Sequence, residues 1–354
     1  MKIFVINPGS TSTKIALYED EKSLWVENIH HTAEELSLYT CVNEQYHFRK
    51  QSVLQALANA SIPLAFDAII ARGGLLHPTP GGVYSINERM KYDLLHARME
   101  HACNLGALLA DEFSKEIKCP AFIADPEVVD EFQEKSRLTG LPEIERISIF
   151  HALNSKAVSR KYALSRGCVY EDLNLIVVHL GGGISVGAHR KGRVIDVNNA
   201  LNGEGPFSPE RAGTLPADQF AELCFSGKYT LKEIKKMLNG KGGLIAHLGT
   251  NHVPAIIRKA QNGDKHCALV LEAMIYTVAK QVGAMHVALC GKTDGIILTG
   301  GIAHSDYCVK MLSEQIDYLA PVVLMPGEDE MGSLAFNALG AMNGSLPLQE
   351  YGKS

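Results

Sequence analysis

The chain has 354 residues, of which 46% are apolar and 21% are charged. This length and composition exclude disordered and fibrous proteins, and they suffice for a sizeable core in two domains of ordinary size. The net charge of −5, with no dense cluster of basic residues, excludes a nucleic-acid backbone as the expected partner. A small-molecule partner is therefore expected.

The cysteines and apolar segments favour the cytoplasm. The eight cysteines are dispersed without a CxxC pair, so neither a structural zinc site nor a disulfide framework is predicted. The start, MKIFVINPGS, has an apolar run too short for a signal peptide, and no apolar span of 18 residues stands out. We expect a cytoplasmic protein that does not contact a membrane.

In chain order, the apolar patterns predict alternating strands and helices. Strands are expected at 2–7, 13–18, 25–29, 67–71, 121–124, 174–179, 184–189, 193–196, 294–299 and 321–325. Helices are expected at 32–38, 49–60, 99–117, 152–165, 216–225, 230–238, 267–289 and 306–319. The pattern indicates an α/β fold with mixed sheets.

Two segments of the first half recur in the second half. Residues 3–16 (IFVINPGSTSTKIA) match residues 175–188 (LIVVHLGGGISVGA), which aligns Asn7 with His179 and Thr13 with Ser185 at an offset of 172. Residues 67–77 (DAIIARGGLLH) match residues 294–304 (DGIILTGGIAH) at an offset of 227. Two matches in the same order predict a duplicated fold, with an insertion in the second half that includes residues 198–249.

Three glycine-containing turns follow predicted strands and are candidates for binding phosphate. The turn at 7–14 (NPGSTSTK) offers backbone amides and the hydroxyls of Ser10, Thr11 and Ser12, with Lys14 at its end. The turn at 179–185 carries Gly181, Gly182 and Gly183, although a tight structural turn is an alternative. Gly300 and Gly301 precede a predicted helix and could admit a nucleotide against the backbone.

The chain resembles the butyrate kinases, a branch of the acetate kinase (acetokinase) family within the superfamily of sugar kinases, Hsp70 and actin. The resemblance extends from Lys2 to Leu339. It rests on INPGSTSTK, ARGGLLHPTPGG, DPEVVDEF, SIFHALN, LTGGIAH, PGEDE and, most specifically, the segment from His179 to Pro216.

The resemblance implies transfer of the ATP γ-phosphoryl group to the carboxylate of a short-chain fatty acid. Because that carboxylate is already an anion at neutral pH, no general base is needed, and catalysis depends on positioning and charge cancellation. By similarity, Arg72 and Arg211 would flank the phosphoryl group and the acid, and His179 would donate a hydrogen bond to the phosphoryl group. Asp125 would help to organise the site and, in addition, could act as the N-cap of a helix after Pro126.

The resemblance also implies a magnesium site. Asn7 and Glu330 match the family's pattern, although Glu328 and Asp329 compete with Glu330, and hard oxygen ligands suit Mg²⁺. One departure concerns the adenosine: where relatives tend to carry a Ser-Asp pair and an Arg, this chain has Asn251, His252 and Pro254. The adenine contacts on that side therefore stay open.

The expected protein has two duplicated α/β domains with RNase H-like sheets around a central cleft. Residues 1–150 and about 325–354 would form the acid and phosphoryl side, and residues 151–324 the nucleotide side. The expected activity is that of a butyrate kinase using ATP and Mg²⁺, in a homo-oligomer. A kinase for branched-chain acids is the nearest alternative, and an Hsp70-like or actin-like nucleotide switch is an alternative of another class.

Overall fold

The structure is a computed structural model that describes residues 1–97 and 100–352, and the chain divides into two compact units. Unit 1 consists of Met1–Val129, Ala152–Ala157 and Asp329–Ser354, and unit 2 consists of Asp130–His151 and Val158–Glu328. The compact units divide the chain at Val129, His151, Ala157 and Glu328. The functional domain boundaries expected at about residues 150 and 325 stay a prediction.

Unit 1 is built on a seven-stranded mixed sheet with the order β12-β5-β6-β4-β1-β2-β3. Its strands are β1 (Lys2–Pro8), β2 (Ser12–Glu19), β3 (Lys22–His30), β4 (Ala68–Arg72), β5 (Val83–Ser85), β6 (Ala121–Ala124) and β12 (Leu348–Glu350). Its helices are α1 (Ala33–Leu36), η1 (Val42–Gln45), α2 (Tyr46–Asn59), α3 (Glu88–Leu95), α4 (Asn104–Ile117) and α12 (Glu330–Asn343).

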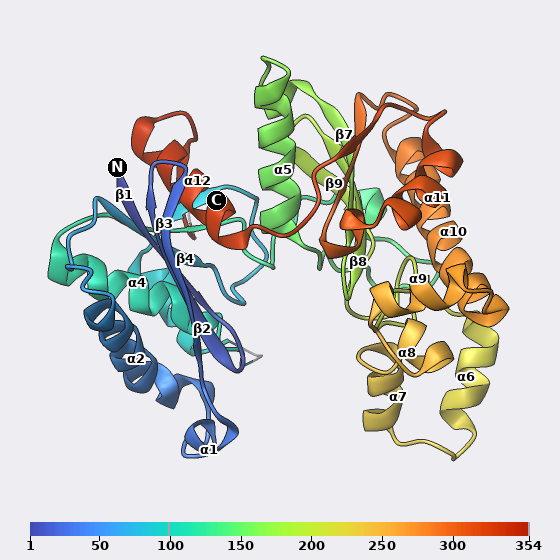
Figure 1. Cartoon of the computed structure of the whole chain (residues 1–354), viewed down its shortest axis with the longest axis horizontal. Coiled ribbons are helices and arrows are strands. Elements are labelled where there is room, and N and C mark those ends of the chain that lie inside the picture. Colours follow the sequence, from blue (N-terminus) through green and yellow to red (C-terminus); the bar gives the residue numbers. More distant parts are fainter. Residues whose placement is uncertain (98–99, 353–354) are drawn as a thin grey trace. The chain divides into compact units, whose positions relative to one another are not determined.

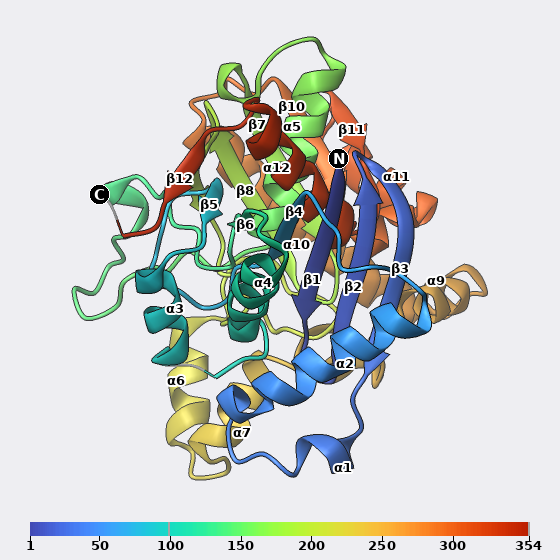
Figure 2. The same ribbon diagram turned by 90° about the vertical axis from the view of Figure 1, so that its left-hand side faces the viewer.

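Both faces of this sheet are covered, which is why its central strands are apolar on both sides. Phe4 and Ile6 of β1 pack with apolar residues of α2 and α4, whereas Ile3 and Val5 pack with those of α12. Figure 2 shows α2 and α4 in front of the strands. The C-terminal segment therefore completes the core that the first strand begins.

Unit 2 is built on a five-stranded sheet with the order β11-β10-β7-β8-β9. Figure 1 shows α10 and α11 on one side of its strands and α5 on the other. The strands are β7 (Asn174–Leu180), β8 (Ile184–Arg190), β9 (Arg193–Val197), β10 (Gly295–Thr299) and β11 (Val322–Leu324). The helices are η2 (Glu134–Ser136), η3 (Tyr170–Asp172), α6 (Ala217–Phe225), α7 (Leu231–Leu238), α8 (Gly243–Leu248), α9 (Val253–Gln261), α10 (Lys265–Ala288), η4 (Gly301–His304) and α11 (Asp306–Ile316), together with the part of α5 (Ala152–Ser165) that follows Ala157.

Helix α10 is long and apolar enough, by length and composition alone, to cross a membrane. The expectation that no such span exists is therefore wrong. Its buried residues, among them Leu271, Met274 and Val278, belong to the largest hydrophobic cluster of unit 2. This packing accounts for part of the hydropathy of α10, because 39% of its most apolar stretch is buried.

Strand pairing supports the predicted duplication and corrects one detail. Val5 pairs in parallel with Ile70 in unit 1, and Val177 pairs in parallel with Ile297 in unit 2, in agreement with both offsets. The β7–β8 turn is one residue shorter, however, because Asn7 faces Lys14 whereas His179 faces Ser185. Ser185 is thus the counterpart of Lys14 and not of Thr13, since the length of a hairpin loop sets its register.

Every predicted strand and helix is present, with bounds that shift by a few residues. The largest shift is at α4, which begins at Asn104; the expected start of that helix, Met99, lies outside the described residues. The sequence patterns did not indicate β5, β12, α3, α8, α9 or α12. The two missed strands have three residues each, and α12 is rich in small residues without a polar stripe, so neither presents a clear period.

Candidate active site

The residues predicted for the site fall into two groups, one in each unit, and each group is described by itself. Unit 1 holds Asn7, the turn to Lys14, Arg72, Asp125 and Glu330. Unit 2 holds His179, Gly181–Gly183, Arg211, Gly300 and Gly301.

In unit 1, Glu330 joins Asn7 to Arg72. Asn7 at the end of β1 donates a 2.8 Å hydrogen bond to Oε2 of Glu330, and Arg72 at the end of β4 forms a 2.6 Å ion pair with its Oε1. Because β1 and β4 are parallel neighbours, their carboxyl ends lie side by side, and α12 brings Glu330 to the same edge. The structure thus assembles three of the predicted residues in one cluster.

Glu127 is a member of this cluster that was not predicted. It forms a 2.5 Å ion pair with Nε of Arg72, whose guanidinium is thus held by two carboxylates. Burial lowers the pKa of Arg72, but Glu127 and Glu330 outweigh this effect and raise it. The guanidinium is fixed at the strand end as a permanent cation. The position of Glu127 in DPEVVDEF, two residues after Asp125, was the signal that could have identified it.

The three neighbouring acidic residues have different surroundings. Glu330 accepts a hydrogen bond from Asn7, Asp329 accepts one from the amide of Gly332 and caps α12, and Glu328 contacts His179 in unit 2. Of the three, Glu330 therefore has the contacts that fit the predicted role of a metal ligand beside Asn7.

Asp125 is tied to the backbone of the neighbouring loop. Its buried carboxylate accepts a 2.7 Å hydrogen bond from the amide of Gly82, and its own amide donates to the carbonyl of Gly82. Its φ of 38° lies in the left-handed region, which is strained for a residue other than glycine. No helix follows Pro126, so the additional role of an N-cap is wrong: the chain forms a short turn there instead.

The turn between β1 and β2 exposes Ser10, Thr11 and Lys14. The amide of Gly9 donates to the carbonyl of Ser12, which closes the turn. His101, which the sequence did not single out, lies 3.2 Å from the hydroxyl of Ser10 through its Nε2. Burial, together with Arg72 and Arg49, lowers the pKa of His101, although Glu127 opposes this. No recognisable spacing marks this histidine in the sequence.

In unit 2, His179 is fully buried near the end of β7 and contacts two titratable side chains. The ring of His151 stacks on it at 3.7 Å between centroids, and Nε2 of His179 contacts Oε1 of Glu328. His151 is placed in turn by Ser185, 3.0 Å from its Nδ1. The donor atoms of His151, His179 and Glu328 lie close enough together to hold a metal ion.

The glycines after β7 differ in what surrounds them. A methyl group on Gly183 would overlap the guanidinium of Arg211, which occupies the space above that glycine and donates a 2.7 Å hydrogen bond to the carbonyl of Ala200. A methyl group on Gly182 would lie 3.4 Å from the carboxylate of Glu210. Burial lowers the pKa of Arg211, and Glu210 offsets part of this effect. Gly183 thus makes room for the predicted arginine.

The two glycines at 300 and 301 also differ in the space around them. Gly300 has a φ of 86°, and a side chain there would meet the backbone of Leu180 at 2.5 Å, so only glycine fits. A methyl group on Gly301 would meet no atom within 4 Å. Gly301 is therefore the position of this pair where a ligand can approach the backbone.

The segment that departs from the family's pattern is also ordered. Asn251 donates a 2.7 Å hydrogen bond to the carboxylate of Glu210, and His252 immediately precedes α9. This contact connects the departing residues to the element that carries Arg211.

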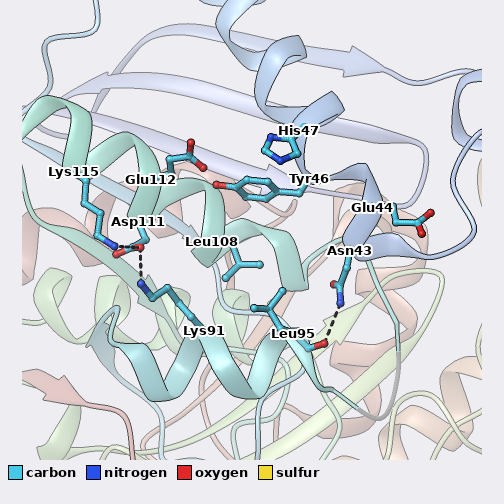
Figure 3. A pocket seen from close by; sticks show the side chains of 10 residues that line it. All are labelled: Asn43, Glu44, Tyr46, His47, Lys91, Leu95, Leu108, Asp111, Glu112 and Lys115. Carbon is cyan, nitrogen blue, oxygen red and sulfur yellow. Dashed lines mark hydrogen bonds and ion pairs between the residues drawn. The ribbon is translucent and has the colours of Figure 1, made fainter.

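A surface cavity of about 510 Å³ lies elsewhere in unit 1, between η1, α2, α3 and α4 (Figure 3). Asp111 pairs with both Lys91 and Lys115, whereas Glu44 accepts hydrogen bonds from Thr40 and Glu112 pairs with Lys50. None of the predicted site residues lines it.

Comparison with known proteins agrees with these features. A family model described as the acetokinase family matches residues 144–320. A protein named probable butyrate kinase from Phocaeicola vulgatus is 77% identical, and butyrate kinase 1 of Clostridium acetobutylicum is 49% identical, each over 99% of both chains. The solved acetate kinase of Porphyromonas gingivalis has a TM-score of 0.76 at 17% identity, covering 97% of this chain and 99% of that one. This likeness confirms the predicted fold class.

Proposed function

This chain belongs to the acetokinase family, and from that premise we propose that it transfers the γ-phosphoryl group of ATP reversibly to butyrate. The products are butyryl phosphate and ADP. The chain is a phosphotransferase with a carboxyl group as acceptor, and relatives named butyrate kinase match it over almost its whole length.

The observation that carries the proposal is the fixed cation at the end of β4. Arg72 is oriented by Glu127 and Glu330 beside Asn7, next to a turn with exposed hydroxyls. The reacting carboxylate, the γ-phosphoryl group and the transition state are all negative, so a preorganised guanidinium stabilises the charge that crowds together on transfer. Its planar fork can pair with two oxygens at once.

Three further side chains complete the proposed chemistry. Arg211 adds a second guanidinium, held over Gly183. His179 donates from Nε2 to the phosphoryl group; in the structure this nitrogen faces the carboxylate of Glu328, an anion such as the phosphoryl oxygen would be. Asp125 supports the site through the loop at Gly82. No proton has to be removed from the acid, because a carboxylate is ionised at neutral pH.

The residues of unit 1 fit a magnesium ion. Glu330 and Asn7 supply a carboxylate and an amide oxygen, which are hard ligands of the kind that Mg²⁺ prefers, and they already contact each other. When bound there with ATP, Mg²⁺ would neutralise phosphate charge. The phosphates themselves would be held by Ser10, Thr11, Ser12 and Lys14, with the nucleotide against Gly181–Gly183, Gly300 and Gly301.

We also propose that the enzyme works in the cytoplasm as a homo-oligomer. The exposed apolar side chains of Leu269, Tyr276 and Val287 on α10 support self-association, because large apolar groups on a surface favour burial against a partner. Sedimentation or light scattering would measure the assembly.

The proposed activity is tested by formation of acyl hydroxamate from ATP, Mg²⁺ and a panel of straight and branched acids of two to six carbons. We expect the highest kcat/KM with butyrate. A preparation of Arg72→Ala purified in the same way serves as the blank for contaminating kinases. A branched acid as the best substrate would favour the branched-chain alternative, and turnover with none of the acids would refute the enzyme and favour a nucleotide switch.

A further inference from the structure

The turn between β1 and β2 keeps its carbonyl groups away from its exposed surface. The carbonyls of Ser10 and Ser12 accept hydrogen bonds from Arg49, and the carbonyl of Thr11 accepts one from the amide of His31. Among the described residues, the amides of Ser10 and Thr11 have no acceptor, and both residues are exposed. Three carbonyls of the turn are thus paired while two of its amides remain available as donors, which is the balance that an anion-binding turn needs.

Arg49 of α2 uses all five of its N–H groups, three of them to hold this turn. Nη1 donates to the carbonyl of Ser12 and to Oγ1 of Thr13, both at 3.0 Å, and Nη2 donates to the carbonyl of Ser10 at 3.2 Å. The remaining bonds, from Nε and Nη2, go to Oε1 of Gln45 at 3.1 and 3.0 Å. The side chain is fully buried, so no freedom is left to its guanidinium plane.

Each of these acceptors is neutral. A fully buried cation would ordinarily pair with a carboxylate, because burial of an uncompensated charge is costly. Burial alone accounts for the lowered pKa of Arg49, and the positive charge of Arg49 adds to burial in lowering the pKa of His31 to about 4. His31 also faces Glu35 and His30, whose effects are smaller. The charge of Arg49 is thus felt by the groups around the turn.

We propose that Arg49 is a positioning residue for the phosphate groups of ATP: it turns the carbonyls of Ser10 and Ser12 inward and places a buried positive charge beneath the turn. This inference rests on the proposed function, since it assumes that the turn binds phosphate. Arg49 does not touch the ligand in this scheme. It acts through the geometry of the turn and through its charge, which is expensive to bury unless an anion shares the site.

The test separates the phosphates from the nucleoside. Binding of ATP with Mg²⁺ and of adenosine is measured by calorimetry for the wild type, Arg49→Met and Arg49→Lys. We expect Arg49→Met to weaken ATP roughly tenfold or more and to leave adenosine unchanged, because hydrogen bonds to a charged group are lost only beneath the phosphate turn. Arg49→Lys keeps the charge but not the planar fork, so its affinity for ATP should lie between those of the wild type and Arg49→Met.

Lys50→Met is the matched control, since it removes a cation from the same helix that pairs instead with Glu112 and Glu116. It should bind ATP as the wild type does. If Arg49→Met does not fold, a several-fold loss of ATP affinity in a folded Arg49→Lys supports the proposal. Unchanged ATP affinity, or equal losses for ATP and adenosine, would overturn it, whereas a wild type that binds no ATP would refute the proposed function itself.

Discussion

Gly183→Ala tests whether the absence of a side chain at this position is required for the guanidinium of Arg211 to occupy its place. Its φ lies outside the left-handed region, so the backbone itself accepts alanine. The added methyl group would overlap the guanidinium of Arg211 and lie 3.1 Å from the carbonyl of Ala200. Because that carbonyl belongs to the backbone, the arginine is the group that must move.

The size of the effect follows from what Arg211 loses. The 2.7 Å hydrogen bond from Nη1 to the carbonyl of Ala200 cannot survive the displacement, and a bond from a charged donor contributes about 1.5–3 kcal/mol. Alanine also restricts the unfolded chain more than glycine does, which stabilises the folded state by about 0.4–1 kcal/mol. The net loss of stability is therefore about 1–2 kcal/mol. Turnover should fall about 10²–10³-fold, as on removal of one preorganised donor.

Acyl hydroxamate kinetics and thermal unfolding measure both effects, with Gly283→Ala as the control. Gly283 lies within α10, and a methyl group there meets no atom within 4 Å, so its replacement should leave turnover unchanged and stabilise the helix slightly. The double variant Gly183→Ala, Arg211→Ala should be no slower than Arg211→Ala alone, because both act through one guanidinium. Additive losses, or wild-type turnover in Gly183→Ala, would refute this reasoning.

Three other predictions concern Arg72, His179 and His31. Arg72→Ala should lower kcat at least about a hundredfold while ATP still binds, and retention of more than about a tenth of kcat would contradict its role. His179→Gln, which keeps an N–H, should be clearly more active than His179→Ala; equal loss in both would argue against a donor. His31, whose pKa is lowered to about 4, stays neutral in the folded state while the unfolded chain takes up a proton below about pH 6.5. Stability should therefore fall by up to ~1.4 kcal/mol per pH unit between pH 6.5 and 4, and denaturant titrations should show that His31→Gln removes this slope whereas the control His30→Gln keeps it.

The sequence alone was sufficient for the strand framework. Central strands such as 3–6 and 175–178 are apolar runs bounded by turn residues, which is a local property, and their repetition at two offsets revealed the duplication. Arg72 was identified through the resemblance to the acetokinase family, which rests on local motifs such as ARGGLLHPTPGG. Sequence patterns of this kind reveal local structure, because they depend on residues that are close together in the chain.

Tertiary structure alone decided the partners. Arg72 and Glu330 are 258 residues apart and meet because α12 returns to the edge of the sheet that β4 helped to build. Likewise Arg49, on a helix, reaches beneath a turn 37 residues earlier in the chain, and Gly183 is small because a guanidinium from another loop fills its space. Such contacts depend on packing between elements, and no local period or spacing encodes which buried charge will face which backbone group.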